Sequence, residues 1–347
     1  MPAMRQKLEH WLNQIWYGGV EPPAWLRWLV PLYRAAFVLD RSIKTSRRPK
    51  DLAAIPIAVV GNLTVGGSGK TPLVIRLCRL LEQAGLRPGV VSRGYGRSDR
   101  HLVLVKANSS PSEAGDEPLV IARRTGVPVV VSSDRCEGAR KLISQGVNVI
   151  ISDDGLQHHR LPRTVEICVV DGERAFGNGE LLPAGPLREP VNRMNAVDFV
   201  VINGAEPVSG LNHEATRMLF VPGLLYSLGG DETWRLSQFA GCRVNALAGI
   251  GNPERFFKTL EQAGLHLKKH VFPDHHAYSA SDFSSLEPGW PIIMTEKDAV
   301  KCRGLELDNA WYLAVEASLP SAWEVEFLSR MVKPGQMGRG EGRHYEH

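Results

Sequence analysis

A glycine-rich segment between an apolar strand and a helical pattern constrains the fold of this chain more than any other feature. Residues 61–71 read GNLTVGGSGKT, directly after the apolar run Ile57–Val60 and before a helical pattern that begins at Pro72. Glycines let backbone N–H groups curl around phosphate oxygens, and the N-terminus of the following helix adds a favourable dipole. The segment therefore predicts a phosphate-binding loop, or P-loop, although Thr64 stands where the generic motif has its first glycine.

The residues of this loop have separate roles in holding a nucleotide. Lys70 can reach the β- and γ-phosphates, and the hydroxyl of Thr71 can bind Mg²⁺. The alternative is a glycine-rich turn that happens to precede Lys-Thr, but the flanking strand and helix favour the nucleotide site. The predicted nucleotide-binding residues are Thr64, Val65, Gly66, Gly67, Ser68, Gly69, Lys70 and Thr71.

A second apolar run ends in two carboxylates. Val147–Ile151 is followed, after one serine, by Asp153 and Asp154. A buried strand that ends in a carboxylate is the arrangement that holds Mg²⁺ beside a P-loop. Because a strand-terminal Asp can also be a turn residue or a helix cap, we favour Asp153 as the metal-linked group and leave the role of Asp154 open. The polar run 157–159 could face the same cleft, although a lone His is more often a structural hydrogen-bonding group.

Strand and helix patterns alternate through the first two thirds of the chain. Near-continuous Val/Ile runs separated by helices are typical of a buried parallel sheet. We therefore predict an α/β fold of the P-loop NTPase type, with a mostly parallel sheet flanked by helices. The predicted strands are 57–60, 89–91, 127–131, 147–151, 166–170 and 198–202, and the predicted helices are 72–83, 118–124 and 135–144.

A second alternating region begins near Arg243 and indicates a smaller α/β domain. Between the two regions, residues 204–240 show no clear pattern, so we place the domain junction there. The predicted elements of this region are strands 244–250, 291–294 and 311–315 and helices 253–263 and 321–331. The predicted divisions are 1–50 (helical segment), 51–225 (P-loop domain), 226–334 (smaller domain, closing the cleft) and 335–347 (disordered tail).

Positive charge and tryptophan are concentrated in the first 50 residues. This segment has nine basic and three acidic residues, a charge of +6, and four of the eight Trp. Apolar side chains recur at helical spacing between Trp25 and Phe37, although Pro31 interrupts the pattern. The residues alone support two interpretations equally, namely a helix packed on the core and an amphipathic helix lying in a membrane interface.

The rest of the composition excludes several classes of protein. The charge outside the first 50 residues is −2, which argues against a general nucleic-acid binder. The five Cys are scattered without a C-x-x-C pair, so we expect neither a disulfide framework nor a zinc site. We expect no transmembrane helix, because no apolar stretch is long enough, and no signal peptide.

An ordered set of motifs resembles the tetraacyldisaccharide 4′-kinases, the ATP-dependent kinases of lipid A assembly. The resemblance extends from about Trp16 to about Val332 and includes the Thr64 departure from the generic P-loop. Its motifs are VGN at 60–62 running into the P-loop, SRGYG at 92–96, GDEP at 115–118, SDDGLQH at 152–158, GNG at 177–179, LPAGPLREP at 182–190, FPDHH at 272–276 and MTEKDAVK at 294–301.

The resemblance implies a reaction and a location. The γ-phosphate of ATP would pass to the 4′-hydroxyl of a tetraacylated glucosamine disaccharide 1-phosphate, giving lipid IVA. The implied location is the cytoplasmic face of the Gram-negative inner membrane, as a peripheral (monotopic) protein. An acceptor with four acyl chains also favours the membrane-interface interpretation of residues 1–50.

The resemblance also implies residue roles. Asp116 matches the family's proposed base and His275 its assisting His from the other domain, with Asp274 and Lys70 completing the catalytic set. Without the resemblance, the alternative for Asp116 is a helix cap, and the sequence favours a solvent-facing loop position for His275. The resemblance reverses that preference for His275. The residues that resemble the acceptor-binding set are Ser92, Arg93, Tyr95, Arg135, Gln157, His158, Arg188 and Glu189.

A function of another class competes with the kinase. A P-loop NTPase could act as a partner-regulated switch or metallochaperone, hydrolysing nucleotide with no small acceptor. The chain has no Asn-Lys-x-Asp guanine motif, because Lys297 in the run 295–298 falls one place late, and this weakens a GTPase version.

Overall fold

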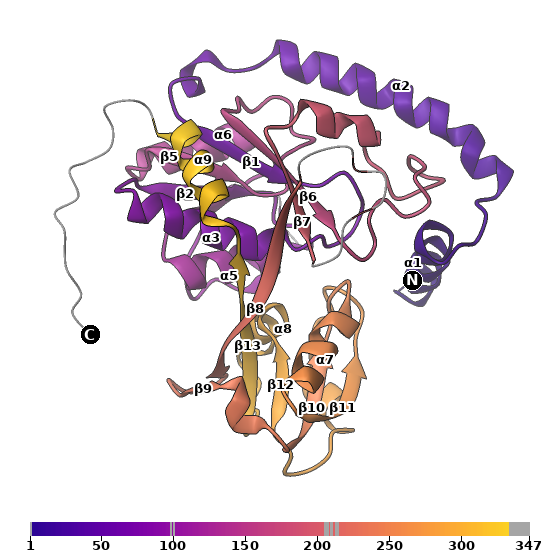
Figure 1. Ribbon diagram of the computed structural model, residues 1–347, viewed down its shortest axis with the longest axis vertical. Coiled ribbons are helices and arrows are strands. Elements are labelled where there is room, and N and C mark those ends of the chain that lie inside the picture. The colour runs from indigo at the N-terminus through magenta and orange to yellow at the C-terminus, as the bar shows by residue number, and fades with distance from the viewer. Residues whose placement is uncertain are drawn as a thin grey trace.

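The computed structural model describes residues 2–97, 99, 101–204, 208, 211 and 215–332, with side chains from Lys7 onward. Its strands form one sheet (Figure 1) in the order β11-β10-β12-β13-β8-β7-β6-β1-β5-β2-β4-β3, with β9 paired to β8. The strands are β1 (Ile57–Gly61), β2 (Pro88–Ser92), β3 (Val103–Val105), β4 (Val129–Val131), β5 (Val149–Ser152), β6 (Val165–Asp171), β7 (Phe199–Asn203), β8 (Thr216–Ser227), β9 (Thr233–Arg235), β10 (Arg243–Ala248), β11 (His266–Val271), β12 (Ile292–Thr295) and β13 (Ala310–Ser318).

Helices cover both faces of the P-loop half of the sheet. The helices of the described chain are α1 (Pro2–Tyr17), α2 (Ala24–Ser46), α3 (Lys70–Gln83), α4 (Pro111–Ala114), α5 (Asp116–Thr125), α6 (Arg135–Ser144), α7 (Pro253–Gln262), α8 (Glu296–Cys302) and α9 (Ser321–Met331), with 3-10 turns η1 (Lys50–Leu52), η2 (Val191–Ala196), η3 (Leu236–Phe239) and η4 (Ala280–Phe283). One core joins α3, α5 and α9 to the sheet, and a second joins α6 and η1 to the opposite face.

The sheet is mostly parallel, as the Val/Ile runs predicted. Strands β4, β2, β5, β1, β6 and β7 pair in parallel, and among the described strands of this half only the edge strand β3 runs antiparallel. Strands β11, β10, β12 and β13 form a second parallel group. Because parallel strands end at one edge, the loops after β1, β2 and β5 meet there and can build a site.

One long strand, β8, joins the two halves. Its first residues pair in parallel with β7, and residues 219–227 pair antiparallel with β13. The predicted boundary at 225/226 falls inside this strand. After β13 the chain returns to the P-loop half of the molecule. There, Trp323, Phe327 and Met331 of α9 pack in the core beside α3. The final helix therefore belongs to the P-loop side rather than to the smaller domain, and the predicted tail 335–347 lies outside the described residues.

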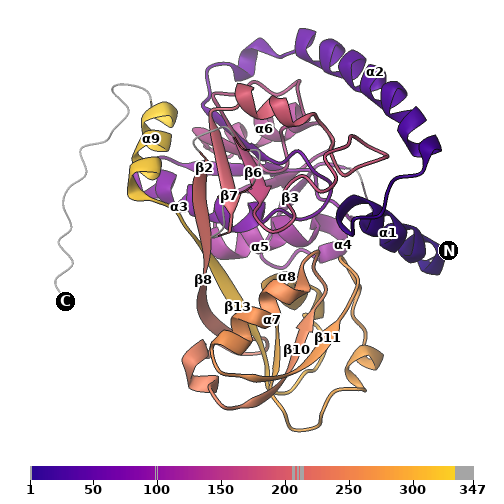
Figure 2. The same ribbon diagram turned by 45° about the vertical axis from the view of Figure 1, so that its right-hand side comes forward.

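The N-terminal segment forms two helices at the periphery (Figure 2). Helix α2 runs unbroken through Pro31, so the proline does not end it. Ile15, Trp16 and Leu26 anchor both helices in a small apolar cluster on the P-loop domain. No helix in the described ranges is both long and apolar enough to cross a membrane. All five cysteines are free.

An ion-pair network joins the two halves beside α5. Arg124 of α5 contacts Glu296 of α8 at 2.8 Å, and its other nitrogen contacts Glu316 of β13. Arg79 of α3 also reaches Glu316 at 2.6 Å. Burial raises the pKa of Glu296 to about 7, and the charge of Arg124 only partly offsets that burial. The folded chain therefore binds a proton at Glu296 more tightly than the unfolded chain does.

This proton makes stability depend on pH. The stabilisation from protonated Glu296 is complete below the usual carboxyl pKa of 4.5 and is lost as pH rises through about 7. Glu296→Gln should therefore raise the free energy of unfolding at pH 8 by up to about 3 kcal/mol, and much less at pH 5. Thermal melts from pH 5 to 8 measure this. A variant that is less stable than wild type at pH 8 would show that the charged pair with Arg124 is net stabilising.

Candidate active site

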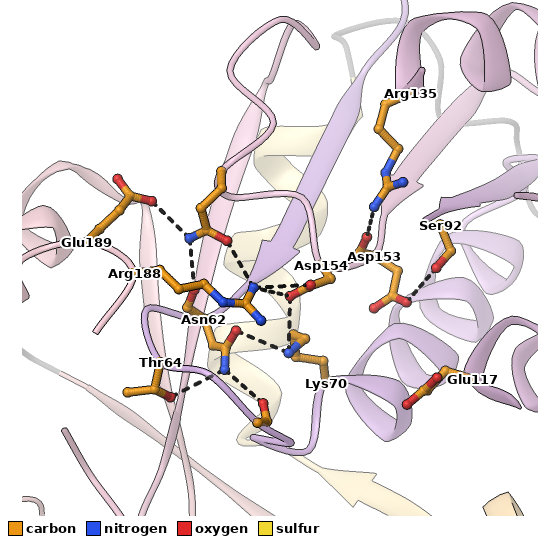
Figure 3. Close-up of polar contacts among 12 residues, drawn as sticks. Asn62, Thr64, Lys70, Ser92, Glu117, Arg135, Asp153, Asp154, Arg188 and Glu189 are labelled. Carbon is orange, nitrogen blue, oxygen red and sulfur yellow. Dashed lines mark hydrogen bonds and ion pairs between the residues drawn. The ribbon is translucent and has the colours of Figure 1, made fainter. Parts of the chain in front are cut away.

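The P-loop is held in shape by two asparagines. Asn62, fully buried after β1, donates to the Gly66 carbonyl at 3.3 Å and accepts from Lys70 Nζ at 3.2 Å (Figure 3). Asn203, at the end of β7, donates to the Ser68 carbonyl at 3.1 Å. Gly69 has a φ of 82°, and a Cβ there would lie 2.2 Å from the Asn203 side chain. Glycine is therefore required at this position both by conformation and by space.

Lys70 and Arg188 converge on Asp154. Lys70 Nζ lies 3.2 Å from one Asp154 oxygen, and Arg188 Nη1 lies 3.2 Å from the other (Figure 3). Burial opposes ionisation of Asp154, but the two cations outweigh it and hold the pKa of that carboxyl well below its usual range. Asp154 is therefore an anion at neutral pH, and it orients both cations at the mouth of the P-loop.

Asp153 has a different environment. It is buried, accepts from the Ser92 hydroxyl at 3.1 Å, and lies beside Asp154. Burial, the charge of Asp154 and the more distant charge of Glu117 raise the pKa of Asp153 to about 6. Asp153, at the end of β5, thus lies in the repulsive field of two other carboxylates, which Lys70 and Arg135 only partly offset. A cation placed among them would relieve that repulsion, as a Mg²⁺ site requires.

An Asp–His pair spans the two halves of the molecule. Asp116, 6% exposed at the start of α5, lies 2.9 Å from Nδ1 of His275, in the loop after β11. Burial is the largest influence and lowers the pKa of His275, but the hydrogen bond to Asp116 and the charges of Asp274 and Glu117 together raise that pKa above its usual value. The Tyr95 ring packs 5.1 Å from the imidazole, between ring centroids. His275 has a φ of 60°, which shows that its loop holds it in an uncommon conformation.

Lys297 forms ion pairs with the two carboxylates that are the sequence neighbours of Asp116 and His275. Its Nζ lies 2.6 Å from Glu117 and 2.9 Å from Asp274, so it connects α5 to the His275 loop. Burial opposes ionisation of both carboxylates, but Lys297 and the charge of His275 together outweigh it and lower the pKa of each. Asp274 therefore acts here in an ion pair that positions its neighbour His275.

A turn of the smaller domain faces the P-loop. A Cβ added at Gly251 would lie 3.7 Å from the Gly67 nitrogen and 3.9 Å from Asp274 Oδ2. Arg174 donates to the Gly251 carbonyl from the P-loop side. The P-loop, this turn and the Asp274–His275 segment are thus adjacent, so phosphate and base can occupy one interdomain site.

Comparison with known proteins identifies the family. The sequence profile described as tetraacyldisaccharide-1-P 4′-kinase matches residues 23–332. This chain belongs to that kinase family. Two relatives named tetraacyldisaccharide 4′-kinase are similar over nearly their whole length. The protein from Shewanella amazonensis is 46% identical, covering 96% of this chain and 99% of the relative, and that from Hahella chejuensis is 48% identical, covering 90% and 94%.

A solved structure of the 4′-kinase family has the same fold. It is the "apo" form of LpxK from Aquifex aeolicus in complex with ATP, solved at 2.2 Å resolution. It superposes with a TM-score of 0.72 at 29% identity, covering 87% of this chain and 97% of that one. The α/β fold expected from the sequence is therefore confirmed.

The structure separates the predicted acceptor-binding residues of this kinase into two groups. Arg188 and Gln157 face the P-loop, where Gln157 donates to the Asn62 carbonyl at 3.0 Å. Tyr95 is exposed and packs beside His275 of the Asp–His pair, and Arg93 is exposed two residues before it. These residues can contact a bound acceptor directly.

The second group is turned inward. Arg135 is 2% exposed and donates to the carbonyls of Ser132 and Asp153 at 3.0 and 3.1 Å (Figure 3). Glu189 is fully buried and accepts from Gln157 at 2.9 Å. Arg135 and Glu189 therefore support the loops that carry the 4′-kinase residues, and contact with an acceptor would require them to move.

His158 lies apart from the P-loop. It groups with Asp134 and Cys136, whose possible ligand atoms lie within 4.8 Å of one another. Asp134 already caps α6 and pairs with Arg160 at 2.8 Å, and burial with nearby positive charge lowers the pKa of His158 to about 4. The positive charges around His158 disfavour a bound cation, so we assign no metal to this group.

Sequence reasoning missed four polar residues of the kinase site. Asn62, Glu117 and Lys297 belong to motifs of the family resemblance, at 60–62, 115–118 and 294–301, and these motifs are the signal that marks them as candidates. Asn203 has no local signal, because its role depends on β7 lying next to the P-loop in space.

Proposed function

We propose that this chain transfers the γ-phosphate of ATP to the 4′-hydroxyl of a tetraacylated glucosamine disaccharide 1-phosphate, giving lipid IVA. The observation that carries the proposal is the Asp116–His275 pair, 2.9 Å apart and contributed by the two halves of the molecule, beside a complete P-loop. A sugar hydroxyl is a weak nucleophile at neutral pH, and such a pair can accept its proton. The family and the ATP-bound Aquifex relative support ATP as the donor.

Each side chain has a physical task in this mechanism. Backbone N–H groups of the P-loop and Lys70 neutralise the phosphate oxygens as charge develops in the transition state. Arg188, oriented by Asp154, is placed to bind a phosphate oxygen. Asp116 and His275 together take the proton of the acceptor hydroxyl, since coupled groups share such work. Lys297 keeps the His275 loop against α5 while they do so.

The residues present fit a magnesium ion. Mg²⁺ prefers oxygen ligands, and Thr71, Asp153 and Asp154 offer a hydroxyl and two carboxylates beside the P-loop. We propose these three as the residues that would hold it, with Glu117 adding negative charge nearby. When bound, Mg²⁺ neutralises charge on the β- and γ-phosphates.

An acceptor assay tests the function. Purified protein, [γ-³²P]ATP and the tetraacylated disaccharide 1-phosphate in mixed micelles should give a labelled lipid only when Mg²⁺ is present. ATP hydrolysis at the same rate without the acceptor, and no labelled lipid, would instead indicate the partner-regulated NTPase.

We further propose that α2 lies in the cytoplasmic leaflet of the inner membrane, where the acyl chains of the acceptor reside. Trp28, Leu32 and Leu39 are exposed and share one stripe of the helix, at i, i+4 and i+11. The opposite stripe contains the buried Leu26 and the half-buried Tyr33 that face the protein. Exposed arginines flank the apolar stripe, as anionic lipid favours.

Charges placed on the apolar stripe should weaken lipid binding. Trp28 and Leu32 are 76% and 67% exposed, so Trp28→Glu with Leu32→Glu should leave the fold intact. The change removes two apolar contacts and adds two anions, so we expect affinity for anionic vesicles to fall at least about tenfold. Vesicle co-sedimentation measures it. Val325→Glu, on α9 and 66% exposed, is the matched control. Equal binding by the double variant and the control would show that α2 does not lie in the membrane.

A further inference from the structure

Two tyrosines of the N-terminal helices reach the backbone of the catalytic loops. Tyr17, the last residue of α1, donates its hydroxyl to the Val65 carbonyl at 3.2 Å. Tyr33 of α2 donates to the Arg188 carbonyl at 2.8 Å. Both side chains are partly buried, and the Tyr17 ring packs against the apolar cluster of Ile15, Trp16 and Leu26. The two hydroxyls thus add directed hydrogen bonds to this apolar packing.

The two accepting carbonyls belong to one small unit. Thr64 and Leu187 form an isolated antiparallel bridge. Val65 N–H donates to the Pro186 carbonyl at 2.9 Å, and Arg188 N–H donates to the Leu63 carbonyl at 2.7 Å. We call residues 63–65 and 186–188 the loop bridge. A tyrosine hydroxyl therefore binds a carbonyl on each of its two strands.

The loop bridge connects the phosphate loop to the acceptor-facing loop. Its first strand opens the P-loop, and its second ends at Arg188, whose guanidinium reaches Asp154 at 3.2 Å and Gln157 at 3.3 Å. A displacement of the bridge would therefore move the nucleotide-binding backbone and Arg188 together. Such displacements matter because phosphoryl transfer depends on reacting groups being held in line.

The helices that hold the bridge are themselves only lightly held. Of the 23 residues of α2, only Leu26 is buried, so few contacts fix the helix on the protein. Trp11 of α1 stacks on Trp25 of α2, with ring centroids 6.3 Å apart, which links the two helices. A lipid surface that binds the exposed stripe would restrict both helices, and with them both tyrosines.

We propose that the N-terminal helices form a positioning element of the catalytic site, in which Tyr17 and Tyr33 hold the loop bridge. Docking of α2 on a lipid surface thereby stabilises the ATP-binding and acceptor-binding arrangement of the loops. The proposal rests on the proposed kinase function and on the membrane placement of α2. By reciprocity, lipid binding and ATP binding favour each other.

ATP binding tests the coupling without any acceptor. The affinity of the full-length protein for ATP and Mg²⁺ is measured by calorimetry, with and without vesicles of phosphatidylethanolamine and phosphatidylglycerol. We expect the vesicles to tighten ATP binding of the wild type at least about threefold and to leave Tyr17→Phe unaffected. If the wild type sediments with vesicles and its ATP affinity stays unchanged, the coupling is refuted, whatever the acceptor assay shows.

Steady-state kinetics separate positioning from packing. Removing one neutral hydrogen bond should raise the KM for ATP in Tyr17→Phe and the KM for the acceptor in Tyr33→Phe, each by about threefold to tenfold. Tyr226→Phe, which removes the hydroxyl of a ring stacked on Tyr312 in the smaller domain, is the matched control and should behave as wild type. Because both contacts act on one bridge, the double variant should lose less than the product of the single effects.

Three kinetic outcomes would overturn the proposal. One is wild-type KM values in both variants of an active enzyme. Another is an equal rise of both KM values together with a lower melting temperature, which would indicate lost packing. The third is a double variant that loses the full product of the single effects. An inactive wild type would overturn the kinase function instead.

Discussion

Replacing Asp116 by asparagine should lower kcat for transfer to the acceptor by about 10²–10⁴-fold, the range that a general base contributes. Asparagine keeps the size of the side chain and can still hydrogen-bond His275, so the start of α5 should remain intact. What it removes is the carboxylate that lies 2.9 Å from Nδ1 of His275 and raises the pKa of that imidazole. The Asp–His pair then has no carboxylate to receive the proton of the sugar hydroxyl.

Single-turnover kinetics with saturating ATP isolate this effect from binding. Adding His275→Gln to Asp116→Asn should cause little further loss, because residues that act as a unit are strongly non-additive. Asp231→Asn, in the exposed turn between β8 and β9, is the matched control and should have wild-type activity. Transfer at the wild-type rate by Asp116→Asn would remove this residue from the catalytic set.

Replacing Lys70 by methionine should lower kcat/KM by about 10²–10³-fold, as expected when one preorganised charge near the transferred group is removed. Lys70 Nζ lies between Asp154 and Asn62, at 3.2 Å from each. Loss of the Lys70 ammonium removes a positive charge that would lie beside the phosphates of ATP. It also leaves Asp154 paired with Arg188 alone in this cluster. Both changes raise the energy of a polyphosphate bound in the loop.

The Lys70 effect should be visible in both ATP affinity and the chemical step. Calorimetric ATP binding and single-turnover transfer measure the two separately. Lys106→Met, on an exposed connection after β3, controls for the loss of a positive charge and should be neutral. If Lys70→Met kept more than about a tenth of wild-type kcat/KM, the P-loop would hold phosphate through its backbone alone.

The parts of the molecule that could be predicted carry their signals locally. The P-loop is one contiguous segment whose strand, glycines and helix each have a sequence signature, and β1 and α3 stand where it placed them. Asp153 and Asp154 follow from the same logic, because an apolar strand that ends in carboxylates brings them to the edge where β1 also ends. The smaller domain was predicted from the alternation of strand and helix patterns that begins near Arg243.

The elements that were missed depend on partners far along the chain. Strand β8 contains Pro222 and Gly223, which disrupt strand patterns, yet it forms because β13 pairs with it across a register shift. Strand β11 is an edge strand, and its two lysines conceal the apolar alternation, as is common for exposed edges. Pro31 weakened the helical pattern of α2, but the helix continues through it.

The candidate site shows the same limit. Lys297 joins Glu117 to Asp274 across 180 and 23 positions of sequence, so its motif marks it as a candidate but cannot name its two partners. Arg135 and Glu189 were predicted to belong to the acceptor-binding set, whereas the structure buries both with hydrogen-bond partners, which is rare for Arg and Glu. Burial of charged side chains is thus the property that sequence reasoning predicted least well.

The position of the new phosphate is the most direct test of the proposed function. The lipid product made by the purified protein from ATP, Mg²⁺ and the tetraacylated disaccharide 1-phosphate is analysed by two-dimensional ¹H–³¹P NMR. The account predicts a second phosphorus signal correlated with the proton at the 4′ carbon, and no such product from Asp116→Asn in the same time. A phosphate on another hydroxyl, or ATP consumed with no phosphorylated lipid, would contradict it.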